Sequence, residues 1–164
     1  QLFVDAALKL KENIPNLQIL LGLHPEIQLT RKIEQQIIII NDEPLKALEV
    51  ANVAIVASGT ATLQAAIMSI PTVVVYKMNS LSWLLTQRLV KVKYASMANI
   101  IADEEVFPEY LQTEATIQNL YKAVYKIFDN DNYKKNLIQK ITTINQKIGD
   151  RGASERAAEY IINN

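Results

Sequence analysis

The tripeptide Ser58-Gly59-Thr60 places two hydroxyls and a glycine where an apolar run ends and a helical pattern begins. Small residues at such a junction leave backbone N–H groups uncovered at a helix start, where an anion can bind. Gly59 lets a ligand approach the backbone closely, and the hydroxyl of Ser58 or Thr60 can cap the helix or bond a phosphate oxygen. Taken alone, the three residues favour a simpler interpretation, which is a capped helix after a tight turn.

Other residue types that could carry chemistry occur in less informative patterns. The only histidine, His24, follows a strand pattern in a predicted loop, and the G-x-S-x-G turn of a hydrolase nucleophile is absent. Asp129-Asn130-Asp131 matches the D-x-D metal motif of some sugar transferases, but it falls between two predicted helices, which indicates a turn. The sequence has no cysteine, no phosphate-binding G-x-x-x-x-G-K-[ST] motif and no G-x-G-x-x-G motif.

Strand and helix patterns alternate along the first part of the chain, and helical patterns alone follow. Short β-branched runs predict parallel strands, while apolar residues at helical spacing predict the helices between them. We therefore expect an α/β fold, a doubly wound parallel sheet with a C-terminal helical tail, in a single domain over residues 1–164. The predicted strands are 17–23, 37–41, 53–57, 72–76 and 99–103, and the predicted helices are 2–10, 43–51, 60–69, 80–92, 104–111, 116–128, 133–148 and 153–162.

Composition excludes some classes of protein. Lys and Arg together number 17, as do Asp and Glu, so charge gives no reason to expect a nucleic-acid partner. No apolar run reaches transmembrane length, and the N-terminal residues do not follow a signal-peptide pattern. Because the chain opens on Gln1 inside a helical pattern, we expect it to be a piece of a longer protein.

An ordered series of motifs from Val53 to Gln112 resembles the lipid-A-disaccharide synthase family. The matching pieces are A-S-G-T-A-T-L, IPTVVVYKM, RLVKVKYAS, NIIA and FPEYLQ, and GASERAAEYI matches the end of the family. The resemblance implies a two-domain, Rossmann-like glycosyltransferase fold called GT-B. It also implies transfer of diacylglucosamine from UDP to diacylglucosamine 1-phosphate, which gives the lipid A disaccharide and UDP. The chain is similar to the C-terminal half, which binds the donor nucleotide.

The resemblance also implies a set of residues that hold the UDP-sugar, with no metal and no other cofactor. The helix start at Ser58–Thr60 and the cation of Lys77 would stabilise the diphosphate, and Asn99 would read the uracil edge or the phosphates. This chain departs from the family at Gln64, where the family has Glu for the ribose, and at Ala98, where the family has Pro. The full set is Ser58, Gly59, Thr60, Gln64, Lys77, Asn99 and Gln112.

Catalytic residues are expected outside this chain. In the resembled family an N-terminal half, followed by a GSR loop upstream of Gln1, provides the acceptor site and the base. The chain alone is therefore expected to be inactive. Its expected partners are the UDP-diacylglucosamine donor, the lipid acceptor through the N-terminal half, the inner membrane surface and a second copy of the chain, and nucleic acid is excluded. The expected location is the cytoplasm, peripheral to the inner membrane of a Gram-negative-type bacterium.

The segment 80–94 has two interpretations. Apolar residues interleave with Arg88, Lys91 and Lys93, which fits a helix packed on the sheet or, alternatively, a surface that faces acyl chains or a bilayer.

Two further functions stay open for the whole chain. Gln64 could mark a non-catalytic nucleotide-binding module of the same fold. A UDP-sugar epimerase of similar fold is the other, but it would require a catalytic histidine and an acidic cluster that the sequence does not show.

Overall fold

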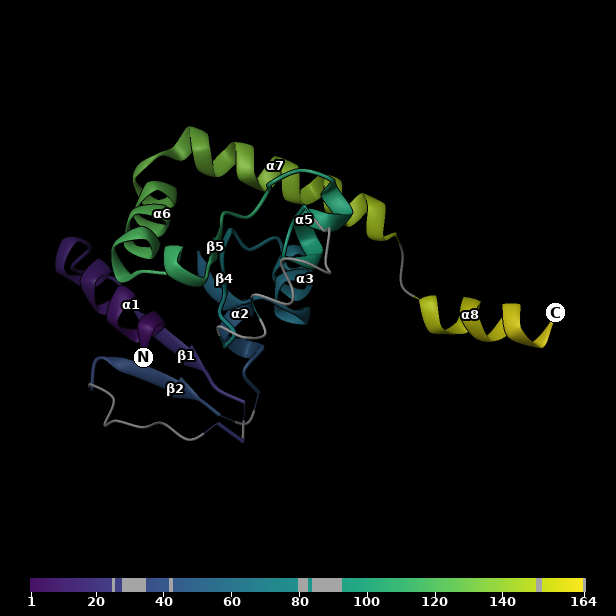
Figure 1. The fold of residues 1–164 in the computed structure, drawn as a ribbon, viewed down its shortest axis with the longest axis horizontal. Helices are drawn as coiled ribbons and strands as arrows, with labels where there is room; N and C mark the ends of the chain where they lie inside the picture. Colours follow the sequence, from purple (N-terminus) through teal and green to yellow (C-terminus); the bar gives the residue numbers. More distant parts are fainter. Residues whose placement is uncertain are drawn as a thin grey trace.

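The computed structural model describes residues 1–24, 26–27, 35–41, 43–79, 83, 93–149 and 152–163. Strands and helices alternate over the first part of the chain and helices follow, which confirms the predicted α/β fold with a helical tail (Figure 1). The elements are α1 (Leu2–Asn13), β1 (Ile19–Gly22), β2 (Ile37–Ile40), α2 (Lys46–Glu49), β3 (Ala54–Ala57), α3 (Thr60–Ile67), β4 (Thr72–Tyr76), α5 (Met97–Ala102), β5 (Glu109–Leu111), the 3-10 helix η1 (Gln112–Glu114), α6 (Ile117–Asp129), α7 (Asp131–Ile148) and α8 (Ala153–Ile162).

All the described strand pairs are parallel, as predicted, but they form two sheets. β1 pairs with β2, while β3, β4 and β5 form a second sheet in that order. In the second sheet Ala57 is in register with Val75, and Tyr76 is in register with Leu111. The carboxyl ends of these three strands therefore lie along one edge of the sheet.

The central strand of the second sheet is covered on both faces. Val73 and Val74 of β4 have no exposed surface, because α6 and α3 both contact β3 and β4. Helices α5 and α7 in turn pack against α3. Large apolar side chains from α6, α7 and the segment before β5 complete this core and are fully buried, namely Phe107, Leu120, Ile127, Ile141 and Ile144. Burial on this scale is the main term that stabilises such a domain.

Strand β2 is only partly buried. Val4 of α1 packs with Ile19 and Ile37 on one side of the first sheet. Ile38 is 54% exposed and Ile39 is 37% exposed, because no described element packs over them. The prediction of parallel pairing is thus confirmed for β2.

Residues 97–111 reverse the predicted assignment, which placed a strand over 99–103 and a helix over 104–111. The hydroxyl of Ser96 accepts from the Asn99 amide at 3.2 Å and so caps α5, and Asp103 ends that helix in a left-handed conformation (φ 58°). The following segment does not continue the helix, because the Asn99 side chain accepts from the amides of Val106 and Phe107, and it leads into β5 beside β4.

The C-terminal helices agree with prediction. Asp129 ends α6 and Asp131 begins α7, while the side chain of Asn130 accepts from the Tyr133 amide at 2.8 Å, so this segment is a helix-to-helix turn as expected. Figure 1 shows α8 extending away from the rest of the molecule, and Tyr160, Ile161 and Ile162 on it are more than 70% exposed. No helix in the described part of the chain has the length and apolar character to cross a membrane.

The predicted helix 80–92, including Arg88 and Lys91, lies outside the described residues apart from Trp83. Lys93, at the end of the basic segment, is exposed and lies with its Nζ 4.9 Å from the centre of the Tyr94 ring.

Candidate functional site

Three of the predicted site residues follow directly on the last residues of neighbouring strands. Ser58 follows β3, Lys77 follows β4 and Gln112 follows β5. The parallel register of the three strands brings these positions to the same edge of the sheet. Ligands of open α/β sheets bind at this carboxyl edge, so it is the candidate functional site.

The start of α3 presents uncovered backbone donors at this edge. Gly59 is the N-cap residue, with φ 140° and ψ −155°, and a side chain placed there would meet nothing within 4 Å. The Gly59 carbonyl accepts from both the amide and the hydroxyl of Thr62, at 3.2 Å and 2.8 Å. Within the described part of the chain, the amides of Gly59, Thr60 and Ala61 have no acceptor. They therefore form the positive end of the helix dipole, available to an anion.

Ser58 does not cap this helix, and neither does Thr60. The Ser58 hydroxyl donates to the Ala95 carbonyl at 2.8 Å, and its amide donates to the Val75 carbonyl at 2.8 Å. Helix α3 has no side-chain cap, so the predicted capping role is wrong for both hydroxyls. Because its proton is engaged with Ala95, the Ser58 hydroxyl can meet a ligand only as an acceptor.

Gln64 and Lys77 are the two long polar side chains beside the helix start. Gln64 lies one turn after Thr60 on α3, is half-buried, and has no side-chain hydrogen bond to another described residue. Lys77 is exposed, and no described carboxylate lies within ion-pair distance of it. Both side chains are thus free of the described residues and able to reach a ligand at this edge.

Asn99 lies inside the protein. Its side chain has no exposed surface and makes four hydrogen bonds, because the oxygen accepts from the amides of Val106 and Phe107 while the nitrogen donates to the Phe107 carbonyl and to Glu109 Oε1. The four distances are between 2.7 and 2.9 Å. In this arrangement the amide has no donor or acceptor left for a nucleotide.

Gln112 contacts the loop that follows β4. It has a left-handed backbone (φ 45°), and its side-chain amide can donate to the Met78 carbonyl and accept from the Met78 amide, both at 3.2 Å. These two hydrogen bonds hold the backbone of Met78, the residue that follows Lys77. Gln112 therefore shapes the edge through Met78.

Glu109 is the residue that sequence reasoning missed. Its carboxylate accepts from the amides of Ala95 and Ser96 and from the Asn99 side chain, at 2.7, 2.8 and 2.7 Å. The residue sits within the FPEYLQ piece of the family resemblance. That motif is the only signal that could have pointed to it, since neither its spacing nor a charged neighbour distinguishes it.

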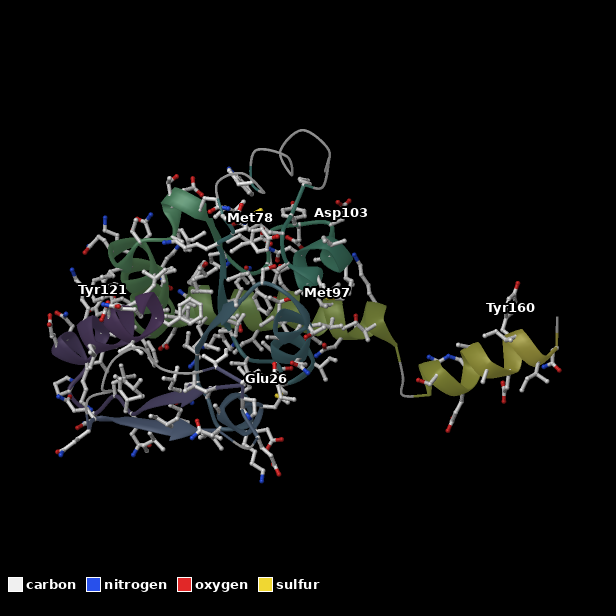
Figure 2. All side chains as sticks on the ribbon, turned by 60° about the horizontal axis from the view of Figure 1, so that its bottom comes forward. Glu26, Met78, Met97, Asp103, Tyr121 and Tyr160 are labelled. Carbon is white, nitrogen blue, oxygen red and sulfur yellow. The ribbon has the colours of Figure 1, made fainter. Side chains whose placement is uncertain are left out.

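Two other places are set apart from this edge. Figure 2 shows Met78 well separated from Glu26, whose amide donates to the Nδ1 of exposed His24 at 3.4 Å, so the histidine loop does not join the candidate site.

A shallow depression of about 280 Å³ lies where the chain enters β5, which is the opposite end of that strand, and its lining includes Glu105, Tyr110 and Tyr133. Burial raises the pKa of both tyrosines.

Metal ligands are not grouped in the described part of the chain. No three His, Cys, Asp or Glu side chains within it lie close enough together to hold an ion. Among the described residues, this edge offers oriented amides, the cation of Lys77 and neutral amide side chains.

Parallel strands that alternate with helices, with an open helix start at the carboxyl edge of the sheet, define a Rossmann-like α/β fold with a helical tail. The sequence narrows this class further. The chain belongs to the lipid-A-disaccharide synthetase family, whose model matches residues 1–162. The resemblance seen in the motifs is thereby confirmed over nearly the whole chain.

Curated relatives carry the name lipid-A-disaccharide synthase. The protein of Haemophilus influenzae strain PittEE is 35% identical over 98% of this chain and 44% of its own length. That of Rickettsia prowazekii is 32% identical over 98% of this chain and 43% of its length. That of Coxiella burnetii strain CbuG_Q212 is 28% identical over 99% of this chain and 44% of its length. The chain thus spans less than half the length of these relatives.

Proposed function

We propose that this chain is the donor-nucleotide-binding part of a glycosyltransferase of lipid A synthesis. The enzyme would transfer diacylglucosamine from UDP to diacylglucosamine 1-phosphate and release UDP. The observation that carries the proposal is the set of open amides at Gly59, Thr60 and Ala61, at the carboxyl edge of the sheet in a member of this family. The acceptor lipid and the base would belong to the part of the enzyme outside this chain.

The proposed chemistry follows from the charge that develops on the leaving diphosphate. The three amides and the Thr60 hydroxyl donate to its oxygens, and Lys77 adds a full positive charge at the same edge. Gln64, one helical turn away, faces the ribose hydroxyls. Gln112 keeps the Lys77–Met78 backbone in place. Each group stabilises the product UDP more strongly as negative charge accumulates on it.

UDP is expected to bind the 164-residue chain weakly and without a divalent metal. The helix start and Lys77 supply the positive potential that the diphosphate needs, so a metal bridge adds little. Titration calorimetry with UDP, once with a chelator and once with magnesium, measures this directly. Uridine, which lacks the diphosphate, is the matched control and is expected to bind much more weakly. Binding that appears only with magnesium would contradict the proposed charge stabilisation.

A second candidate function is a nucleotide-binding module without catalytic turnover. The observation that favours it is Gln64, since an amide bonds two ribose hydroxyls less strongly than the carboxylate that the family resemblance implies there. This candidate and the transferase both require a ribose contact from this position.

Gln64→Glu is expected to tighten UDP by on the order of 1 kcal/mol, the difference between neutral and charge-assisted hydrogen bonds. The gain should shrink for 2′-deoxy-UDP, which lacks one hydroxyl partner. Calorimetric affinities of both ligands for both proteins separate ribose contact from other effects. Equal changes for UDP and its deoxy analogue would rule out a ribose contact from residue 64.

A further inference from the structure

The carboxylate of Glu109 holds the turn that leads into α5. Its Oε2 accepts from the Ala95 amide, while Oε1 accepts from the Ser96 amide and the Asn99 side chain. Glu109 lies near the start of β5, in register with Val74, so the group is anchored on the sheet. Hydrogen bonds from backbone amides to an ionised carboxylate are among the stronger ones in proteins, which makes this a firm attachment.

The same turn is attached to the candidate site from its other side. The Ala95 carbonyl accepts from the Ser58 hydroxyl at 2.8 Å, while the Ala95 amide donates to Glu109 at 2.7 Å. Ala95 is therefore held on one side by Glu109 of β5 and on the other by Ser58, which precedes Gly59. A continuous path of hydrogen bonds runs from Glu109 through Ala95 to Ser58.

We propose that Glu109 is a positioning residue for the nucleotide site. By fixing Ala95 it fixes the Ser58 side chain, and with it the direction of the amides of Gly59, Thr60 and Ala61. The inference rests on the proposed function, because these amides are the proposed diphosphate donors. Donors of this kind work only when held in the orientation that the ligand requires, so a small rotation at residue 58 weakens all of them together.

The location of the bond between Ala95 and Ser58 indicates that Glu109 does more than stabilise the turn before α5. Helix α5 has its own cap in Ser96, and Asn99 already ties it to Val106 and Phe107. The bond between Ala95 and Ser58 is not needed for either contact. Its effect is to connect the α5 turn with the end of β3, where the open amides begin.

The test uses three single variants and one double variant of the full chain. UDP affinity is measured by calorimetry at a temperature at which every variant is folded. Glu109→Gln keeps the shape but turns an N–H₂ group toward the backbone donors, and Ser58→Ala cuts the path at its other end. Each is expected to weaken UDP binding at least about fivefold. Both substitutions act through Ala95. The double variant should therefore bind UDP about as weakly as whichever single variant has the lower affinity, and no more weakly. Glu114→Gln, an exposed carboxylate just past β5, is the control and should stay within about twofold of the parent.

A purely structural role predicts a different outcome. Glu109→Gln would then lower the unfolding temperature and leave UDP affinity unchanged, which would overturn the proposal, as would losses that simply add in the double variant. Should Glu109→Gln not fold, Glu109→Asp replaces it, because the shorter carboxylate cannot reach the Ala95 and Ser96 amides in the same way and should also weaken UDP binding.

A ligand-free measurement keeps this inference separate from the proposed function. In amide NMR spectra of the chain without UDP, Glu109→Gln and Ser58→Ala should both shift the signals of Gly59, Thr60 and Ala61. If both variants show these shifts but the parent chain does not bind UDP, the proposed function fails, while the role of Glu109 in orienting the three amides stands. Unchanged signals in Glu109→Gln would overturn the positioning role.

Discussion

Asn99→Ala is expected to destabilise the protein by about 3–5 kcal/mol, because each buried group left without its hydrogen-bond partner costs about 1–3 kcal/mol and several are left here. The substitution strands the buried amides of Val106 and Phe107 as well as the Phe107 carbonyl. It also removes one of the three donors to Glu109. Urea unfolding, read as a change in midpoint at constant slope, measures the loss.

Two further variants sharpen this result. Asn99→Asp has the same shape, but its second oxygen would face the Phe107 carbonyl and the Glu109 carboxylate, so it should be no more stable than the alanine variant. Asn132→Ala, on the exposed surface of α7, is the control and should change stability by less than about 0.5 kcal/mol. An Asn99→Ala protein as stable as the parent would contradict the structural role of this side chain.

Gly59→Ala is expected to have the largest effect on ligand binding. A Cβ at this position meets open space, so no packing clash arises, but the backbone has φ 140°, a region that residues with side chains rarely adopt. Holding alanine there costs about 1–3 kcal/mol, and relief of that strain turns the neighbouring amides away from the ligand. We expect UDP affinity to fall by at least about tenfold, equivalent to about 1.4 kcal/mol.

Gly149→Ala is the matched control for backbone strain. Gly149 also has a positive φ, 76°, and open space where a Cβ would be, but it lies at the end of α7. The two variants should lose stability to a similar extent, as measured by thermal unfolding, while calorimetry should detect weaker UDP binding only for Gly59→Ala. Equal UDP affinities in the two variants would show that the α3 start does not bind the diphosphate.

Local patterns in the sequence were enough to predict most of the elements. The helices over α6, α7 and α8 follow from apolar residues at helical spacing, and β3 and β4 follow from β-branched runs. The Ser58–Thr60 junction could be found in the same way, because a strand followed at once by a helix is a local feature. Parallel alternation then predicted that Lys77 would share its edge.

The segment 97–111 could not be assigned correctly, because its conformation depends on groups brought together by the fold. N-I-I-A has an apolar run that suits a strand, yet Ser96 caps it as a helix. E-Y-L has no strongly apolar pattern, and it becomes a strand because β4 offers an open edge beside it. Exposure of Ile38 and Ile39 likewise depends on which elements pack over β2.

The α/β class, the family and the place of Ser58 and Lys77 at the carboxyl edge of the sheet could be read from the amino-acid sequence, since each follows from motifs or from spacing within one element. What Ser58, Asn99 and Glu109 do depends on contacts that form only in the folded chain. Asn99 is a buried structural amide, Ser58 donates to Ala95, and Glu109 holds the turn between them. The physical reason is that a polar side chain has a fixed capacity for hydrogen bonds, and which partners fill it depends on segments that come together only in the folded chain.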